Sequence, residues 1–179
     1  MSLLRDTVSK IKNDFREENI SFKVFILNYF YSPRFRVLLN HRIGKFFSQS
    51  NILFSNHLAA YYKRRLIVKR GCDISYNAVI GKKVAMPHPI GIVIGDGVIV
   101  EDHVSIFQQV TFGSHGKQKL QNSYPVIRKG ARIYSGAKII GGITIGENAV
   151  IGANSVVNID VPPNSVAVGI PCRIIEKNK

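Results

Sequence analysis

The chain has 179 residues, of which 45% are hydrophobic and 20% are charged. This length suits one ordinary domain, or one domain with a small appendage, and it is too short for two full-sized domains. The apolar side chains are numerous enough to offset the entropy cost of ordering the chain, which excludes a disordered polyelectrolyte. The sequence therefore predicts one globular unit.

The charge is strongly positive and unevenly distributed. Twenty-five Lys and Arg against eleven Asp and Glu give a formal charge of +14, and residues 1–70 hold fourteen of the basic residues but four of the acidic ones. A basic surface attracts nucleic acid, anionic lipid headgroups, acidic glycans or phosphorylated cofactors, and charge alone does not choose among them. A solvated basic face without a partner fits equally well.

Neither a secretion signal nor a membrane span is indicated. Residues 1–12 carry charges where a signal peptide needs an apolar stretch, and the apolar runs elsewhere are short. Cys72 and Cys172 lack the spacing of a disulfide framework or a zinc site. We therefore expect a cytoplasmic protein without a metal, whose basic first part could touch the inner face of an anionic membrane.

Residues 1–70 are expected to form a helical region. Leu, Val, Ile and Phe recur at mixed three- and four-residue spacings among charges in residues 3–19 and 52–70. Between these segments, Pro33 is well placed to begin another helix that continues to Phe47. This region would form a small helical cap on the part of the chain that follows.

Residues 71–179 contain a six-residue repeat. Two apolar series occupy every sixth position: Ile74, Ile80, Met86, Ile92, Val98, Val104 and Val110, then Ile127, Ile133, Ile139, Ile145, Ile151 and Val157. A small residue often follows four positions later, as at Ala78 and Ala131. A period of six fits neither a helix nor a simple alternating strand, and it describes short strands joined by tight corners. Stacked coils of this kind bury a continuous aliphatic column.

Residues 111–126 interrupt the repeat, because Val110 and Ile127 are seventeen positions apart. The polar segment 113–125 is therefore expected to be a loop that leaves the stack. Loops held out from a rigid scaffold often carry binding and catalytic residues, although a merely tolerated insertion is the alternative. Residues 164–175 are expected to form a last strand before a basic C-terminal tail.

Four segments carry a family resemblance: His88-Pro-Ile-Gly-Ile-Val-Ile-Gly95, Val104-Ser-Ile-Phe-Gln-Gln-Val-Thr-Phe-Gly113, Ile133-Tyr-Ser-Gly-Ala-Lys-Ile139 and Val166-Ala-Val-Gly-Ile-Pro171. With the repeats, they resemble the serine O-acetyltransferase branch of the hexapeptide-repeat acyltransferases. The resemblance implies a mainly β fold, a left-handed parallel β-helix of triangular section after a small α-helical region, assembled as a homotrimer. It also implies acetyl-CoA as the co-substrate, bound between neighbouring subunits.

The resemblance matches His88 to the catalytic histidine of the family. Acetyl transfer from a thioester to a hydroxyl needs a base for the hydroxyl proton, and an imidazole suits this role because its ordinary pKa lies near neutrality. Prolines on both sides of His88 would stiffen the backbone that presents it. The other four histidines have weaker claims: His103 and His115 could assist, while His41 and His57 are expected to be surface or packing residues.

The resemblance also implies residues that bind the substrates. Ser114, Ser135 and Ala153 are expected along the pantetheine arm of acetyl-CoA. Several basic residues could meet its adenosine phosphates: Arg173, Lys117, Lys119, Lys177 and Lys179. Tyr124 and Phe107 could stack against a sugar acceptor, and each could equally be a packing residue.

Departures from the family pattern direct the choice of acceptor. The serine enzymes hold the ammonium and carboxylate of the amino acid with an aspartate before the catalytic histidine and with an Arg-His-Pro sequence that ends the loop. This chain has Pro87 and Ser123-Tyr124-Pro125 at those positions. Because desolvated charges without partners are costly, serine is expected to bind poorly. We therefore expect acetylation of a saccharide hydroxyl of the capsular, exopolysaccharide or O-antigen type, with serine as the alternative acceptor.

Three rival interpretations use the same residues. A metal hydratase would need converging histidines, but His88 and His103 occupy different positions of their hexapeptides and His115 lies in the loop. A nucleic-acid-binding module would need a binding motif that the sequence lacks, so no nucleic acid is expected. The alternative from a different class is a non-catalytic basic scaffold, which would not turn over acetyl-CoA.

Overall fold

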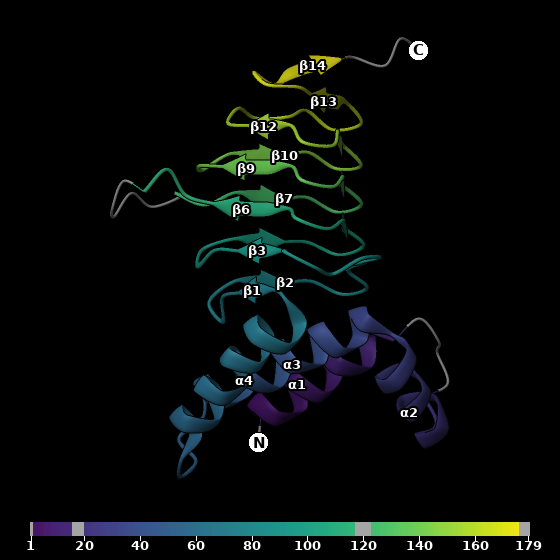
Figure 1. The fold of residues 1–179 in the computed structure, drawn as a ribbon, viewed down its shortest axis with the longest axis vertical. Coiled ribbons are helices and arrows are strands. Elements are labelled where there is room, and N and C mark those ends of the chain that lie inside the picture. Colours follow the sequence, from purple (N-terminus) through teal and green to yellow (C-terminus); the bar gives the residue numbers. More distant parts are fainter. Residues whose placement is uncertain (1, 16–19, 117–122, 176–179) are drawn as a thin grey trace.

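The computed structural model describes residues 2–15, 20–116 and 123–175. Helices occupy one end of an elongated molecule, and a column of short strands stands on them (Figure 1). The helices are α1 (Ser2–Asn13), α2 (Phe22–Tyr31), α3 (Pro33–Ser48) and α4 (Ser55–Arg70). Pro33 begins α3, as the sequence predicted, and the Ser32 hydroxyl caps this helix by accepting from the Phe35 N–H.

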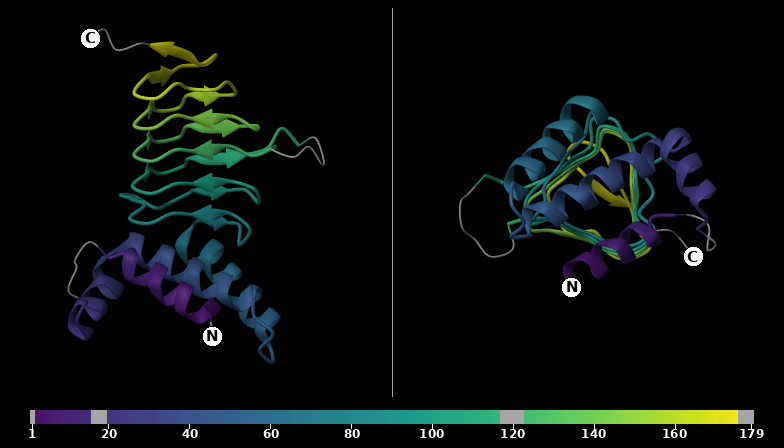
Figure 2. Two further views of the ribbon diagram at one scale, coloured as in Figure 1. Left: turned by 180° about the vertical axis from the view of Figure 1, so that it is seen from behind. Right: turned by 90° about the horizontal axis from the view of Figure 1, so that it is seen from below.

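The strands form the three sides of a triangular prism, which is plain when the column is seen end-on (Figure 2). The first sheet contains β1 (Asp73–Ile74), β3 (Val93–Ile94), β6 (Thr111–Gly113), β9 (Lys138–Ile140) and β12 (Val156–Val157). The second contains β2 (Val79–Ile80), β4 (Ile99–Val100), β7 (Val126–Ile127) and β10 (Thr144–Ile145). The third contains β5 (Ser105–Ile106), β8 (Arg132–Ile133), β11 (Val150–Ile151), β13 (Val166–Val168) and the antiparallel β14 (Arg173–Ile175). The expected parallel β-helix is confirmed.

Two helix boundaries differ from the expectation. The first helix ends at Asn13, and Phe15 instead packs with Phe35 and Leu39 in a separate small apolar cluster. Residues 16–19, also expected to be helical, lie outside the described residues. The fourth helix begins at Ser55 rather than at residue 52, after Phe54 in the left-handed region.

All thirteen residues of the two six-residue series are buried, but the first series joins two different structural positions. Ile74 and Ile80 are the inward residues of β1 and β2, whereas Ile92 precedes β3, whose inward residue is Ile94. Counting by sixes conceals the difference because each repeat buries two side chains that lie two positions apart. The real strand register therefore slips by two residues between Met86 and Ile94.

Strand pairing gives the same result. β1 pairs with β3 at an offset of 20 residues, Asp73 with Val93, whereas β3 pairs with β6 at an offset of 18, Val93 with Thr111. Ala85 also pairs at an offset of 20, with Ser105. The two extra residues of the first coil therefore lie between Ala85 and Val93, the segment that contains His88.

Side chains of α3 and α4 close the open edge of the first coil. Carbonyls on that edge have no further coil to pair with, and buried carbonyls without partners are unfavourable. Five side chains donate hydrogen bonds to them: Lys63 to Ile74 (3.0 Å), His41 Nε2 to Ser75 (3.0 Å), Lys45 to Ala78 (2.8 Å), Arg42 to Ile80 and Gly81 (both 2.9 Å), and Arg34 to Val84 (3.3 Å). The helices therefore replace the missing strand neighbours.

Arg42 also forms a buried ion pair with Asp14, which follows α1. The Arg42 Nε to Asp14 Oδ2 distance is 3.2 Å, and the two side chains are 4% and 1% exposed. Burial raises the pKa of the Asp14 carboxyl, and the charge of Arg42 opposes that shift. One guanidinium thus satisfies both the carboxylate and two edge carbonyls, so it joins α1, α3 and the first coil.

Replacing His41 with glutamine should flatten the dependence of stability on pH. Burial lowers the pKa of His41 from 6.5 to about 3, so the ring is neutral in the folded chain while the unfolded chain gains a proton below 6.5. The stability contributed by this neutral ring is therefore complete above pH 6.5 and is lost as the pH falls toward 3. Glutamine keeps a donor for the Ser75 carbonyl and does not titrate.

Urea unfolding at pH 7 and pH 4 measures this effect. We expect the wild-type chain to lose about 3 kcal/mol more than His41→Gln between the two values, from the shift of about 2.5 pH units that lies in this range. His57→Gln changes an exposed histidine of α4 and should behave like the wild type. Equal losses in the wild type and His41→Gln would contradict the assignment.

Candidate active site

Two edges of the prism carry the predicted site residues. We call the edge between the third and first sheets the His88 edge. It consists of residues 86–92, 107–110, 134–137 and 152–155. The edge between the first and second sheets, which we call the loop edge, carries the segment that leaves the stack after β6 (Figure 1). Within one chain these two edges border opposite sides of the first sheet.

The backbone around His88 is tied on both sides of the corner. Three hydrogen bonds hold it: Ile90 N–H to the His88 carbonyl (2.8 Å), Gly91 N–H to the Gly71 carbonyl (2.7 Å), and the Cys72 thiol to the Pro89 carbonyl (3.1 Å). Gly91 adopts φ +69° beside Gln109, a conformation that favours glycine. Burial raises the pKa of the Cys72 thiol and so keeps it a donor. The corner is therefore fixed while the His88 side chain is exposed.

The His88 edge brings several predicted residues into one column. Backbone hydrogen bonds connect its successive corners: Gln109 N–H to Ile90 (2.8 Å), Gly136 N–H to Gln108 (2.9 Å) and Asn154 N–H to Ser135 (2.8 Å). Ser135 and Ala153 thus lie in the third and fourth coils of the edge that bears His88 in the first. Phe107 lies in the second coil, where its ring stacks on Tyr134 at 4.9 Å and 19°. The small side chains leave room for a thin ligand chain along this edge.

Ser114 and Tyr124 lie on the loop edge instead. Tyr124 is half-buried over Gly95 and Gly97, and a Cβ at Gly97 would come within 2.5 Å of its ring. Tyr124 therefore has a packing role. Within one chain, the structure separates Tyr124 from Phe107 and Ser114 from Ser135, so these pairs could share a ligand only across two subunits.

Tyr124 also lines a groove that the sequence did not predict. The groove has a volume of about 550 Å³ and lies where the first sheet meets α3 and α4, with these lining residues: Ser48, Gln49, Lys63, Asp73, Ser75, Tyr76, Asn77, Val93, Ile94, Gly95, Asp96 and Tyr124. Lys63 forms an ion pair with Asp73, and Asp96 accepts a hydrogen bond from the Ser75 hydroxyl. Charges of both signs therefore meet beside an aromatic ring.

The other histidines lie away from the His88 edge. His103, with φ +62°, occupies the edge between the second and third sheets. His115 lies on the loop edge over Gly141, where a Cβ would meet its Nε2 at 2.3 Å. His57 is exposed on α4, and His41 is the buried packing residue described above. In one chain, His88 is therefore the histidine of the edge that also bears Ser135 and Ala153.

Comparison with known proteins places the chain in a family. The family described as bacterial transferase hexapeptide (six repeats) matches residues 124–158. The serine acetyltransferase of Buchnera aphidicola subsp. Schizaphis graminum is 35% identical over all 179 residues, which cover 67% of that relative. The chain belongs to the hexapeptide-repeat acyltransferases of the serine acetyltransferase type.

The solved structures agree with this membership. A serine acetyltransferase in complex with CoA superposes with a TM-score of 0.76 and 32% sequence identity, over 97% of this chain and 70% of that one. The serine acetyltransferase of Escherichia coli K12 is 39% identical over 147 residues, which are 82% of this chain and 52% of the relative. The predicted left-handed β-helix is confirmed, and so is the prediction of an acetyl-CoA-dependent O-acetyltransferase at the level of the family. The chain thus spans two thirds of the length of the Buchnera relative and about half of the length of the Escherichia coli one.

The expected phosphate contacts of this acyltransferase are described only in part. Arg173 is exposed in β14, at the end of the stack far from the helices (Figure 1). Lys117, Lys119, Lys177 and Lys179 lie outside the described residues. Within the ranges that the structure describes, no helix is long and apolar enough to span a membrane, and no group of three His, Cys, Asp or Glu could hold a metal ion.

Proposed function

We propose that this acyltransferase moves the acetyl group of acetyl-CoA to the hydroxyl of a small acceptor, with His88 as the general base. The observation that carries the proposal is the two-residue slip of the strand register at residues 86–94, which adds chain length to the first coil at the corner that bears His88. The tied backbone fixes the position from which the side chain extends, and proton transfer requires a base that is held near its substrate.

The proposed reaction uses His88 twice. Its imidazole takes the proton of the acceptor hydroxyl while the oxygen attacks the thioester carbonyl carbon. The tetrahedral intermediate then collapses, the carbon–sulfur bond breaks, and the imidazolium returns the proton to the CoA sulfur. The products are an O-acetyl ester and free CoA. Ser135 and Ala153 are proposed to lie along the pantetheine arm, since their small side chains occupy the same edge above His88.

A trimer of about three times 20.0 kDa is expected in solution. The proposed cofactor residues divide between the His88 edge and the loop edge of one chain, so a complete site needs the loop edge of a neighbouring subunit. A threefold closed ring supplies this contact at each of three equivalent sites. Light scattering during size-exclusion chromatography measures the mass, and a monomer that still turns over acetyl-CoA would contradict the shared site.

The comparisons support serine as the acceptor rather than the saccharide expected from the sequence. Both curated relatives named above are serine acetyltransferases. The groove beside Tyr124 adds a physical reason, because it offers Lys63 for a carboxylate and Asp96 for an ammonium group. Because the groove borders the loop edge, we propose that it serves the His88 of a neighbouring subunit. Lys63 and Asp96 could pair with the charges of serine in place of the charged residues that are absent at Pro87 and Ser123-Tyr124. The absence of those residues was the reason for expecting a saccharide, and this reason is therefore weaker.

A saccharide is the second candidate, and the same missing charges favour it. Lys63 already contacts Asp73 and the Ile74 carbonyl, so it is not wholly available for an acceptor carboxylate. The groove also combines an aromatic ring with amide, hydroxyl and carboxylate groups, which suit the hydroxyls and apolar face of a sugar.

An acceptor panel separates the two candidates. Acetyl-CoA is offered with serine, free sugars, nucleotide sugars and oligosaccharides, and free thiol release gives kcat/KM. We expect serine to exceed every neutral saccharide by at least about tenfold, a difference of about 1.4 kcal/mol in transition-state free energy. Lys63→Gln should lower the value for serine and leave that for a sugar nearly unchanged. A saccharide as the best acceptor would make the second candidate the function.

A further inference from the structure

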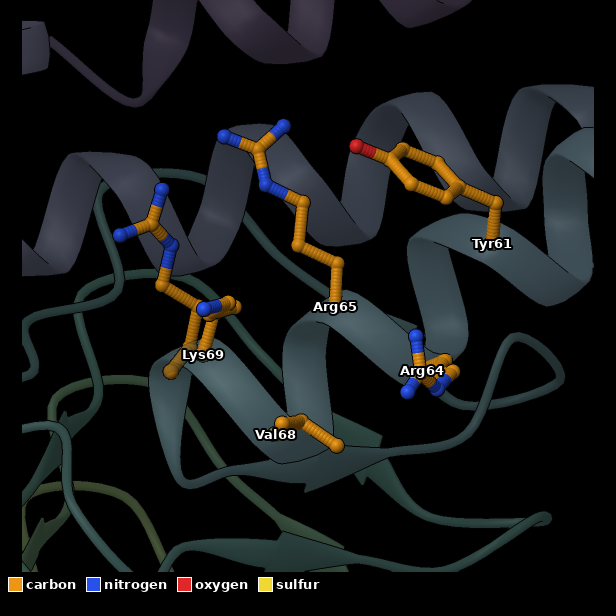
Figure 3. A pocket seen from close by; sticks show the side chains of 6 residues that line it. Tyr61, Arg64, Arg65, Val68 and Lys69 are labelled. Atoms are coloured by element: carbon orange, nitrogen blue, oxygen red, sulfur yellow. The ribbon is translucent and has the colours of Figure 1, made fainter.

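A second pocket lies on the helical region and contains none of the residues assigned to acetyl transfer. It has a volume of about 560 Å³ and is lined by six residues of α4: Tyr61, Arg64, Arg65, Val68, Lys69 and Arg70. Figure 3 shows the Arg65 and Tyr61 side chains extending from α4 toward the facing helix, over the same hollow. Four of the six lining residues are cationic: Arg64, Arg65, Lys69 and Arg70.

Arg36 of α3 adds a fifth positive charge to this cluster. Burial lowers the pKa of Arg70, and the nearby charges of Arg65 and Arg36 lower it further. The Nε atoms of Arg36 and Arg70 are buried and have no hydrogen-bond partner among the described residues. Buried donors of charged groups are normally paired, so these two atoms indicate an acceptor that the described residues do not supply.

The described carboxylates of the helical region are engaged elsewhere. In residues 2–15 and 20–70, Asp6 pairs with Lys10 on α1 and Asp14 is buried against Arg42. Within these residues the basic cluster therefore has no carboxylate of its own. Repulsion among these cations destabilises the protein as long as no anion is bound. A bound anion would relieve this repulsion.

Tyr29 of α2 orients one member of the cluster. Arg65 Nη2 donates a hydrogen bond of 3.1 Å to the Tyr29 hydroxyl, and this contact, with the charges of Arg65 and Arg70, lowers the pKa of that hydroxyl. The guanidinium is therefore held in place before any ligand binds. A preoriented guanidinium loses less side-chain entropy on binding, which favours affinity.

A purely structural role explains part of the cluster. Lys69 and Arg70 occupy the last turn of α4, where cations interact favourably with the helix dipole. That effect does not cover Arg65, which lies in the middle of α4, or Arg36, which lies in the first turn of α3, where the helix dipole disfavours a cation. It also does not account for the two buried Nε atoms. Among the described residues the cluster thus has the Tyr29 hydroxyl as a partner but no carboxylate.

We propose that the pocket lined by Arg65 and Arg70, with Arg64 and Lys69 at its margin and Arg36 of α3 nearby, binds a phosphate or diphosphate group. Planar guanidinium groups bind phosphate oxygens through paired, charge-assisted hydrogen bonds, and the Nε and Nη atoms supply the donors. The volume exceeds that of a diphosphate alone, and Tyr61 and Val68 offer apolar surface to the group attached to it. That group could belong to a soluble phosphorylated compound or to an anionic lipid.

Titration with inorganic pyrophosphate by isothermal calorimetry tests the pocket directly. We expect saturable binding to the wild-type chain that weakens at least about tenfold in Arg65→Gln and in Arg70→Gln, because each loses a charge-assisted hydrogen bond. Arg132→Gln removes one exposed positive charge from β8 and is the matched control, with wild-type affinity expected. Acetyl transfer should be unchanged in all three variants. If Arg70→Gln fails to fold, Arg65→Gln still tests the proposal. The side-chain hydrogen bond that Arg65→Gln removes is the one to the Tyr29 hydroxyl.

Vesicles distinguish the two sources of the phosphate group. The protein is sedimented with phosphatidylcholine vesicles that either contain or lack phosphatidic acid, with and without competing pyrophosphate. Binding that needs phosphatidic acid, is displaced by pyrophosphate and is lost in Arg65→Gln identifies a lipid headgroup. Pyrophosphate binding without vesicle binding identifies a soluble phosphorylated ligand. Absence of both, or equal weakening in Arg132→Gln, would overturn the proposal.

Discussion

The His88→Ala variant should fold and assemble normally and transfer acetyl groups roughly 10²–10⁴-fold more slowly than the wild type, the usual contribution of a positioned general base. Folding should survive because the His88 side chain is exposed and does not belong to the buried aliphatic column. The hydrogen bonds that tie this corner involve backbone groups of His88 and its neighbours together with the Cys72 thiol, and alanine keeps all of them. Acetyl-CoA binding should change little, since its proposed contacts lie at Ser135 and Ala153.

Thiol release under saturating acetyl-CoA measures the loss, and circular dichroism with light scattering verifies fold and assembly. His103→Ala is the matched control, because it removes another exposed histidine from a different edge of the prism. A folded His88→Ala variant within about threefold of wild-type activity would refute the base assignment, since a positioned base contributes far more. If His115→Ala alone is inactive, the proton goes to the loop-edge histidine instead.

Arg42→Met should destabilise the chain by about 3–5 kcal/mol, because it leaves a buried carboxylate without its partner. Methionine nearly preserves the volume, so the loss reports charge and hydrogen bonding rather than a cavity. Besides Asp14, the variant deprives the carbonyls of Ile80 and Gly81 of their donors. The free energy of unfolding from urea titration at pH 7 measures the effect.

Two further variants test the cause of this destabilisation. Arg128→Met breaks a surface pair with Glu101 in which the side chains are 48% and 31% exposed, and it should cost at most about 1 kcal/mol. Combining Arg42→Met with Asp14→Asn removes the unpaired charge and should recover part of the loss. An Arg42→Met variant as stable as Arg128→Met would show that the ion pair does not hold the helical region on the first coil.

The β-helix was predictable because the spacing of aliphatic residues along the sequence is enough to indicate it. Each coil places aliphatic residues at a regular interval, so the period of six is visible in the sequence from Ile74 to Val110 and again from Ile127 to Val157, and it implies a stack. The helical region was less predictable, since the end of α1 depends on tertiary contacts. Phe15 leaves the helix to pack with Phe35, which is far away in the sequence.

The site was only partly predictable, for a related reason. The register slip beside His88 escapes any count by sixes because Ile92 and Ile94 are both buried aliphatic residues. Spacing within one sequence also does not reveal that Tyr124 and Phe107 lie on different edges, which follows from the sheet to which each neighbouring strand belongs. The groove charges Lys63, Asp73 and Asp96 come from α4, from β1 and from the turn after β3, and the contact of these elements is a property of the fold.

A crystal structure of the protein with bound CoA tests the central claim most directly. We expect CoA between two subunits of a trimer, with its pantetheine arm along Ser135 and Ala153, the Ser114 segment of the neighbouring subunit beside it, and the thiol sulfur next to the His88 imidazole. CoA bound away from the His88 edge, or to an isolated chain with its thiol remote from His88, would contradict the account.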